Sequence, residues 1–289
     1  PERVETRAEE VALPVADLLD VQFTDDGNAV DVSPMQMEVK TMGTPEVALN
    51  EKFGRNSARM TNAYGAGTSN YYRVEYSENQ AFKDALADGH SLEVLFSVNY
   101  EKILDKEAKP FSGHEGGGTG LMINGSGRGY ELNFLPHVGG AYRWAQSGIV
   151  PSPFTYYHMV GVWNKEAGKA YIYINGKLAG EASAEGDLKF PATAAQWFGI
   201  GGDASGNMEA QSANNWEIVA ARIYDKPLEG GEVEALWYDL CGTDMTEPDK
   251  HQWDENGVCS TCGELNDEFV SIDEDGYFLV GNVQQWNWV

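Results

Sequence analysis

The chain has 289 residues, of which 42% are hydrophobic, and a formal net charge of −25 at pH 7. This length can bury a sizeable core and predicts one large domain with an appendage. The negative charge disfavours nucleic acid and anionic membranes as partners, and no apolar run is long enough for direct membrane insertion. Thirty-three glycines and eight tryptophans favour a turn-rich β module, so we expect an extracellular or cell-surface location.

The first part of the chain predicts short strands joined by turns. Residues 1–16 are polar and are expected to form a linker or disordered N-terminus before a domain at 17–240. Strands are expected over 18–23, on both sides of a turn at 50–54, and over 71–76. Ser77 is placed to cap a helix that runs to Ala87 and ends at Gly89.

Strict alternation over 92–99 predicts a strand with one buried face. Leucine, valine and phenylalanine occupy every second position, and Glu93 and Asn99 point the other way. A loop is expected from Glu101 to Gly120, because this segment holds a cluster of glycines. Further strands are expected over 121–123, 130–134 and 141–144.

A hairpin over 156–180 is the strongest strand signal of the sequence. Its two aromatic and β-branched runs flank a turn at 164–168, and Asn175-Gly176 predicts a following type I′ turn. We assign Val160, Val162, Ile172 and Ile174 to one buried face. Tyr157, Trp163, Tyr171 and Tyr173 are assigned to the opposite face.

Strands over 197–200 and 216–224 and a helix over 232–240 complete the domain. Short strands separated by turns about every ten residues predict an all-β fold, a sandwich or jelly roll of two antiparallel sheets. From Cys241 onward the chain is strongly acidic. We therefore expect a small Cys/His knuckle at 241–265 and the start of a further, truncated domain at 266–289.

Four motifs together resemble a known family of jelly rolls. They are His158-Met-Val-Gly-Val-Trp163, Tyr171-Ile-Tyr-Ile-Asn-Gly-Lys177, Phe198-Gly-Ile-Gly-Gly202 and Trp216-Glu-Ile-Val-Ala-Ala-Arg-Ile-Tyr224. Their order is similar to that of laminin-G-like, concanavalin-A-like domains, over about 18–240. The resemblance implies ligands on the concave face or the rim loops. It does not separate lectins, adhesion modules and glycosidases, which share this fold.

Two C-terminal segments carry weaker resemblances. Residues 251–263 are similar to a small Cys/His segment of secreted multidomain proteins of gut bacteria. Residues 275–289 look like the opening of a repeat domain. Further domains of the same polypeptide are therefore expected partners.

Three function classes stay open. The favoured one is a non-catalytic module that binds carbohydrate or extracellular matrix, and a structural spacer is another. The third is a divergent glycoside hydrolase, or an accessory module of a larger hydrolase. The Glu-x-Asp-x-x-Glu strand of the fold's glycosidases is absent, which leaves Glu93 and Glu131 as a carboxylate pair that could meet across the concave face.

Sugar binding requires aromatic rings together with amides and carboxylates. The residues expected to supply this mixture on one concave face are Glu93, Asn99, Glu131, Asn133, Trp144, Trp163, Tyr171 and Tyr173. A rim could be formed by His114, Glu115, Tyr142, Arg143 and Trp144. The alternative is that the aromatic rings pack beneath the 101–120 loop.

Two metal sites are expected. Structural Ca²⁺ would bind Asp20, the Gly54 carbonyl and Asp225, because Ca²⁺ prefers oxygen ligands and the resemblance implies sites near the first and last strands. The residues that would hold Zn²⁺ are Cys241, His251, Cys259 and Cys262. A disulfide plus one free thiol is the alternative to zinc.

Overall fold

The computed structural model describes residues 12–61, 70–98, 108–124, 127, 129–203 and 215–241, and the backbone of 271–272 and 278–279. The chain divides into two compact units. One comprises residues 11–236, and the other comprises 1–10 with 237–289. The sandwich described below belongs to the first.

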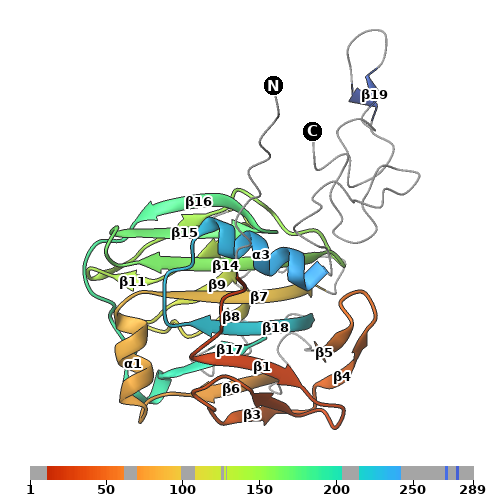
Figure 1. The fold of residues 1–289 in the computed structure, drawn as a ribbon, viewed down its shortest axis with the longest axis horizontal. Helices are drawn as coiled ribbons and strands as arrows, with labels where there is room; N and C mark the ends of the chain where they lie inside the picture. Colours follow the sequence, from red (N-terminus) through yellow and green to blue (C-terminus); the bar gives the residue numbers. More distant parts are fainter. Residues whose placement is uncertain are drawn as a thin grey trace, which may run out of the picture. The chain divides into compact units, whose positions relative to one another are not determined.

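Nine strands form one antiparallel sheet, whose main path runs β16-β15-β14-β7-β18-β1-β2, while β5 pairs with both β18 and β4 (Figure 1). These strands are β1 (Leu19–Phe23), β2 (Ala29–Asp31), β4 (Glu46–Asn50), β5 (Arg55–Met60), β7 (His90–Val98), β14 (Tyr156–Asn164), β15 (Lys169–Ile174), β16 (Lys177–Ser183) and β18 (Trp216–Tyr224).

Seven strands form the second antiparallel sheet, in the order β13-β10-β9-β8-β17-β6-β3. They are β3 (Val39–Met42), β6 (Tyr71–Glu75), β8 (Ala108–Ser112), β9 (Gly120–Ile123), β10 (Leu132–Phe134), β13 (Ala145–Gln146) and β17 (Trp197–Ile200). The remaining elements are β11 (His137–Val138), β12 (Ala141–Tyr142), β19 (Ser271–Ile272), β20 (Phe278–Leu279), α1 (Gln80–Ala87), α3 (Gly230–Cys241) and the 3₁₀ turn η2 (Thr193–Ala195).

The hydrophobic core lies between the two sheets. Leu92, Val94 and Phe96 of β7 are fully buried there, as the alternation predicts, together with Leu121 and Phe134 of the seven-stranded sheet. The predicted all-β, two-sheet antiparallel sandwich is therefore confirmed. Neither helix of the described part of the chain combines the length and the apolar run needed to cross a bilayer.

The faces of the central hairpin differ from the prediction. Ile172 lies opposite Gly161 and Ile174 opposite Met159, so these isoleucines share the core face, where they are 0% and 5% exposed. Val160 and Val162 lie opposite Tyr173 and Tyr171 on the outer face. The burial of the isoleucines is confirmed, but grouping them with the valines is wrong by one residue of register. The Asn175-Gly176 turn has positive φ at both residues, as type I′ requires.

The helix α3 explains why both hairpin faces are apolar. Val233 and Leu236 pack with Val160 and Val162 on the outer face of the nine-stranded sheet, and Figure 1 shows the helix across β14 and β15. An outer-face valine under a helix and a core isoleucine look alike in sequence. The alternation therefore cannot show which of them faces the second sheet.

Two local predictions need correction. The helix α1 begins later than expected, because Asn79 rather than Ser77 caps it: the Asn79 side chain accepts a hydrogen bond from the Phe82 N–H at 3.0 Å. The expected 101–120 loop contains the buried strand β8, which pairs with β9 and β17. Residues 101–107 of that loop lie outside the described residues.

Candidate functional site: a pocket at a fork in the nine-stranded sheet

The strand β18 changes its partner along one edge. Its first residues pair with β5, where Trp216 lies opposite Met60, and its later residues pair with β1, where Ala221 lies opposite Val21. A bulge interrupts the strand between Ile218 and Ala220. Because β5 and β1 pair with successive parts of the same edge of β18, they separate near this bulge, and the sheet forks there.

A pocket of about 410 Å³ occupies this fork. The residues that line it are Asp20, Val21, Gln22, Phe23, Gly54, Arg55, Asn56, Val219, Ala220 and Arg222. The Asn56 amide donates to the Phe23 carbonyl oxygen (3.1 Å) and to the Asp25 carboxylate (2.9 Å), which ties β5 to the end of β1. The lining combines amides, guanidinium groups and a carboxylate with apolar side chains.

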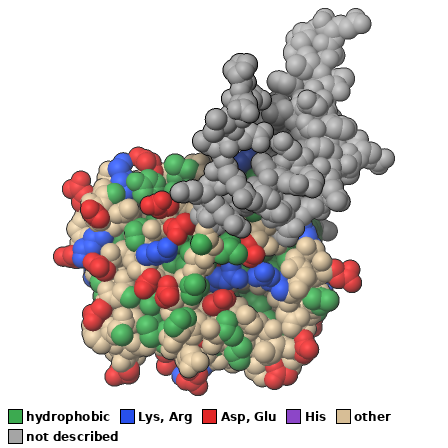
Figure 2. Space-filling model, in the orientation of Figure 1, with side chains coloured by type: hydrophobic (Ala, Val, Ile, Leu, Met, Phe, Trp, Pro, Cys, Tyr) green, Lys and Arg blue, Asp and Glu red, His purple; other side chains and the backbone are tan. Residues whose placement is uncertain are grey.

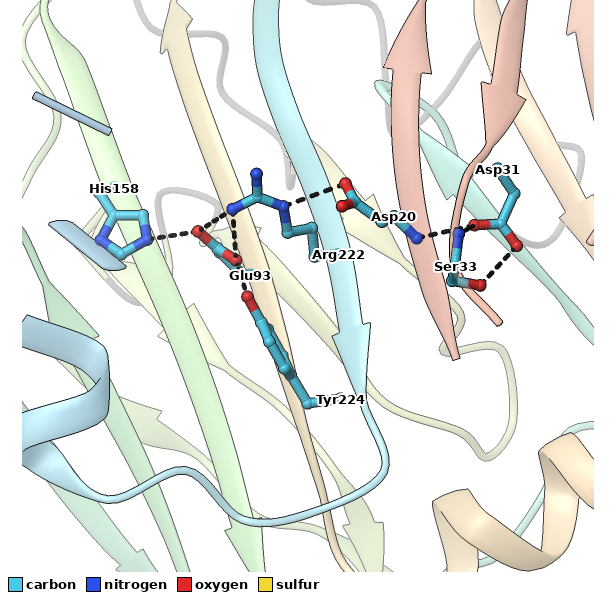
Figure 3. Close-up of polar contacts among 7 residues, drawn as sticks. All are labelled: Asp20, Asp31, Ser33, Glu93, His158, Arg222 and Tyr224. Carbon is cyan, nitrogen blue, oxygen red and sulfur yellow. Dashed lines mark hydrogen bonds and ion pairs between the residues drawn. The ribbon is translucent and has the colours of Figure 1, made fainter. Parts of the chain in front are cut away.

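Arg222 connects the pocket to a buried polar network (Figure 3). Its Nε donates to Asp20 Oδ1 at 3.1 Å, and its Nη1 lies 3.4 Å from both carboxylate oxygens of Glu93. The Asp20 N–H donates to Asp31 Oδ1 at 2.8 Å, and Asp31 also accepts from the Ser33 N–H and hydroxyl. These bonds hold β1, β2 and β18 in register around the pocket wall.

Glu93 is fully buried at the other end of this network. Its carboxylate accepts from His158 Nε2 at 2.9 Å and from the Tyr224 hydroxyl. Burial by itself would raise the pKa of Glu93, but the Arg222 charge and the bonds from His158 and Tyr224 lower it to about 2. Burial and the Glu93 charge raise the pKa of Tyr224 well above its ordinary value. Glu93 is therefore a fixed carboxylate that orients Arg222.

Figure 2 shows the outer face of the nine-stranded sheet, in which Lys and Arg side chains lie side by side near the middle while Asp and Glu dominate the rim. The pocket walls contribute two of the guanidinium groups of the chain, those of Arg55 and Arg222. Chemically, this arrangement offers hydrogen-bond donors and acceptors fixed around an apolar floor. It suits the binding of a polar ligand rather than proton transfer.

Residues 60–234, more than half of the chain, match the family model described as the concanavalin A-like lectin/glucanases superfamily. The chain belongs to this superfamily. A search of curated proteins finds no match.

Several solved structures share this superfamily fold at low sequence identity. The binding domain of botulinum neurotoxin DC in complex with rat synaptotagmin II is 16% identical, with a TM-score of 0.59, over 78% of this chain and 52% of that one. A structure of botulinum neurotoxin type C, whose cell entry depends on two ganglioside molecules, is 18% identical, with a TM-score of 0.56, over 77% and 50%. The binding domain of Paraclostridial Mosquitocidal Protein 1 is 12% identical, with a TM-score of 0.60, over 78% and 52%. The chain thus spans about half the length of these neighbours.

Within this superfamily fold, the predicted sugar-binding residues do not share one face. Glu93 lies on the outer face of the nine-stranded sheet, whereas Asn133 lies on the seven-stranded sheet, in β10. Trp163 is buried in the core, where its Nε1 donates to the Ala184 carbonyl oxygen at 3.1 Å. Tyr171 and Tyr173 are half-buried beside the valines beneath α3. The single concave face assembled from these side chains is wrong, because it combined residues from both sheets and from the core.

The predicted carboxylate pair fails for the same reason. Glu131 precedes β10 on the seven-stranded sheet, where it accepts from the Gln146 amide at 3.4 Å and the Gly148 N–H at 3.3 Å. Glu93 belongs to the other sheet and has no exposed surface. These two groups therefore cannot flank one glycosidic bond.

The rim residues are partly brought together. The rings of His114 and Tyr142 lie 5.8 Å apart, and the Tyr142 hydroxyl accepts from the Gly117 N–H at 3.0 Å. Arg143 donates to the Val138 carbonyl oxygen at 3.0 Å. Glu115 lies beside this group in the chain, and Trp144 is half-buried. Asn99 lies outside the described residues. Contact of any of these side chains with a sugar stays a prediction.

The predicted calcium ligands do not converge. Asp20 and Gly54 line the same pocket, but one carboxylate oxygen of Asp20 already accepts from Arg222. Asp225 instead interacts with Asp17, and burial and the Asp17 charge raise its pKa. Among the residues that the structure describes, no three His, Cys, Asp or Glu side chains gather as metal ligands would. The three positions therefore do not fit one shared Ca²⁺.

The zinc prediction falls largely outside the described residues. His251, Cys259 and Cys262 lie there, and Cys241 is the last residue of α3. Zinc or a disulfide at these positions stays a prediction.

Sequence reasoning missed Gln22, Arg55, Asn56 and Arg222 as pocket residues. One signal was available for Arg222, which is the only charged residue in the six-residue apolar run Ile218–Ile223 of a central strand. A charge in such a run indicates a buried partner or a site. The other three lie in ordinary polar positions near turns, and no local pattern marks them.

Proposed function

We propose that this domain is a non-catalytic module that binds a glycan in the fork pocket, as part of an extracellular or cell-surface protein. The observation that carries the proposal is the pocket itself. It is preformed, it has the size of a small-ligand site, and it joins fixed polar groups to apolar ones.

The lining matches what a sugar ring presents. Hydroxyl groups can donate to the Asp20 carboxylate and accept from Arg55 and Arg222, while Gln22 can do both. The C–H face of a pyranose can rest on Val219, because Val21 and Phe23 belong to the core between the sheets. Because Glu93 and Asp20 hold Arg222 in place, little side-chain freedom is lost on binding.

The superfamily neighbours support a binding role. One is in complex with rat synaptotagmin II, and the cell entry of another depends on two ganglioside molecules. The match covers only about half of each of those two chains, so their ligands could bind in the half that has no counterpart here. The step from those proteins to a glycan ligand here is therefore part of the proposal.

The hydrolase and the structural spacer are the two alternatives to a glycan-binding module. The buried Glu93, ion-paired and held ionised, gives no support to the hydrolase alternative built on it. A structural spacer would need no pocket with polar walls. It would bind no glycan.

An array of sialylated, sulfated and neutral glycans, followed by calorimetry, tests the proposal. Gln22 is exposed at the pocket, so Gln22→Trp should block the entrance and weaken binding more than about tenfold without unfolding the sheet. Gln22→Ala should weaken it less. Gln80→Trp and Gln80→Ala on α1 are matched controls that should leave affinity unchanged. Absence of binding on the array, or equal loss in both pairs, would contradict the proposal.

A further inference from the structure

Phe154 combines two unfavourable features in the 147–155 connection between β13 and β14. Its side chain is 62% exposed, and its φ is +59°. A bulky residue rarely adopts this left-handed conformation, because its Cβ crowds the neighbouring carbonyl. Exposure of a phenylalanine ring adds a hydration cost that no core contact offsets.

The connection holds Phe154 in place at both ends. The Phe154 N–H donates to the Val98 carbonyl oxygen at 2.7 Å, and the Ser152 N–H donates to the Tyr157 hydroxyl at 2.9 Å. The backbone is therefore fixed to β7 and β14. The strain is maintained although the ring itself is exposed.

The other described non-glycine residues with positive φ have evident reasons for it. Asn175 forms the type I′ turn, and asparagine tolerates this conformation. Tyr130 packs its ring against the core, and Gln36 carries a polar side chain. Phe154 alone among these four presents a large apolar group to solvent. Strain of this kind, kept where packing does not require it, points to a binding role.

The surroundings of Phe154 lead toward the fork pocket. Two residues later, the Tyr156 ring packs edge-on against Phe53 with centroids 5.0 Å apart. Lys52 Nζ lies 5.7 Å from the Tyr156 ring centroid. Phe53 directly precedes Gly54, which lines the pocket. The Phe53–Tyr156 ring contact thus joins the β4–β5 turn, which reaches the pocket at Gly54, to the strand that begins just after Phe154.

A sugar ring fits this setting better than a protein surface does. A pyranose has one small apolar face surrounded by hydroxyls, which matches a single exposed ring. A protein partner needs a larger contiguous apolar patch. Within the connection the other exposed apolar side chain is Val150, at 48%.

We infer that Phe154 is the stacking platform of a second sugar subsite, so that the ligand is an oligosaccharide rather than a single sugar. This inference rests on the proposed function, which places the first sugar in the fork pocket. The left-handed backbone fixes the direction of the ring before the ligand arrives.

Substitution of Phe154 separates strain from binding. Phe154→Gly and Phe154→Asn should raise the thermal unfolding midpoint, because both residues tolerate positive φ, and should weaken oligosaccharide binding at least about tenfold. Phe154→Tyr should keep the affinity, since it keeps the ring. Affinity for the monosaccharide that occupies the pocket should not change in any of the three.

The glycan array described above supplies the oligosaccharide and its component monosaccharides as probes. If the wild-type protein binds no glycan, the proposed function fails and the platform fails with it. If it binds glycans and Phe154→Gly binds the same oligosaccharide equally well, only the platform is wrong. Loss of binding to a protein ligand, with oligosaccharide binding unchanged, would also overturn the assignment.

Discussion

Two sets of buried polar groups, one on the outer face of each sheet, differ in whether their hydrogen bonds are made. On the nine-stranded sheet Glu93, His158, Tyr224 and Arg222 form a connected network that reaches the pocket. On the seven-stranded side both amide atoms of Asn124 are buried without a hydrogen-bond partner, as is Oδ1 of Asn133. Buried polar groups stabilise a fold only where their partners are present. Substitutions in the Glu93 network and at Asn124 are therefore expected to have opposite effects on stability.

The largest expected effect is that of Glu93→Gln. It leaves the buried Arg222 without its main counter-charge and should lower the free energy of unfolding by about 3–5 kcal/mol. Urea unfolding measures this value. Glu131→Gln, at a half-exposed position of the other sheet, is the matched control and should change stability by less than about 1 kcal/mol. Similar losses of unfolding free energy for both variants would mean that the Glu93 network adds no more stability than an ordinary surface carboxylate does.

The alternation in β7 predicted the direction of Glu93 but not its environment. It correctly placed Glu93 away from Leu92 and Val94, yet an outward carboxylate was expected to be solvated or to meet a sugar. Arg222 and Tyr224 enclose it from a strand more than a hundred residues later. Such pairing depends on strand order, which local patterns do not encode.

Neither the fork in the sheet nor the faces of the hairpin could be predicted from the sequence, and the reasons are related. The fork exists because β18 pairs with β5 and then with β1, and both segments look like ordinary short strands. The valines of β14 are apolar because α3 covers them, a contact that periodicity cannot distinguish from the core. Alternation thus predicted the two-sheet fold and several strands, and it could not predict which outward side chains meet.

Asparagine substitutions compare the two faces directly. The Asn50 amide donates to Glu217 Oε1 at 2.8 Å and to the Tyr156 hydroxyl at 2.7 Å on the nine-stranded side. Asn50→Leu should therefore cost about 1–3 kcal/mol, because it leaves a buried carboxylate with one donor fewer. Asn124→Leu should be neutral or stabilising, because its amide gives up no hydrogen bond to the protein. Equal destabilisation by both would show that Asn124 has a partner, such as an ordered water.

Acid should separate His114 from Glu93 by the pH at which each loses its contribution to stability. Burial and the Lys109 charge lower the pKa of His114, on the seven-stranded side, well below 6.5. The unfolded state then takes up a proton that folded His114 refuses, so stability falls as pH drops below about 6.5. For Glu93 the contribution is present above about 4.5 and is lost as pH falls toward about 2.

Variants at these positions should flatten different parts of the pH profile. His114→Gln should reduce the decline below pH about 6.5, and Glu93→Gln the decline between about 4.5 and 2. Urea unfolding at closely spaced pH values gives both profiles. An unchanged profile for either variant would remove that group from the explanation of acid sensitivity.

A crystal structure of the protein with a glycan selected on the array shows directly whether the fork pocket is the binding site. We expect a sugar ring in the fork pocket, with hydroxyls within hydrogen-bond distance of Asp20 and Arg222 and the ring over Val219. The Glu93–Arg222 contact should be unchanged, because it already holds Arg222 in place. A glycan bound on the seven-stranded sheet, with the fork pocket empty, would contradict it.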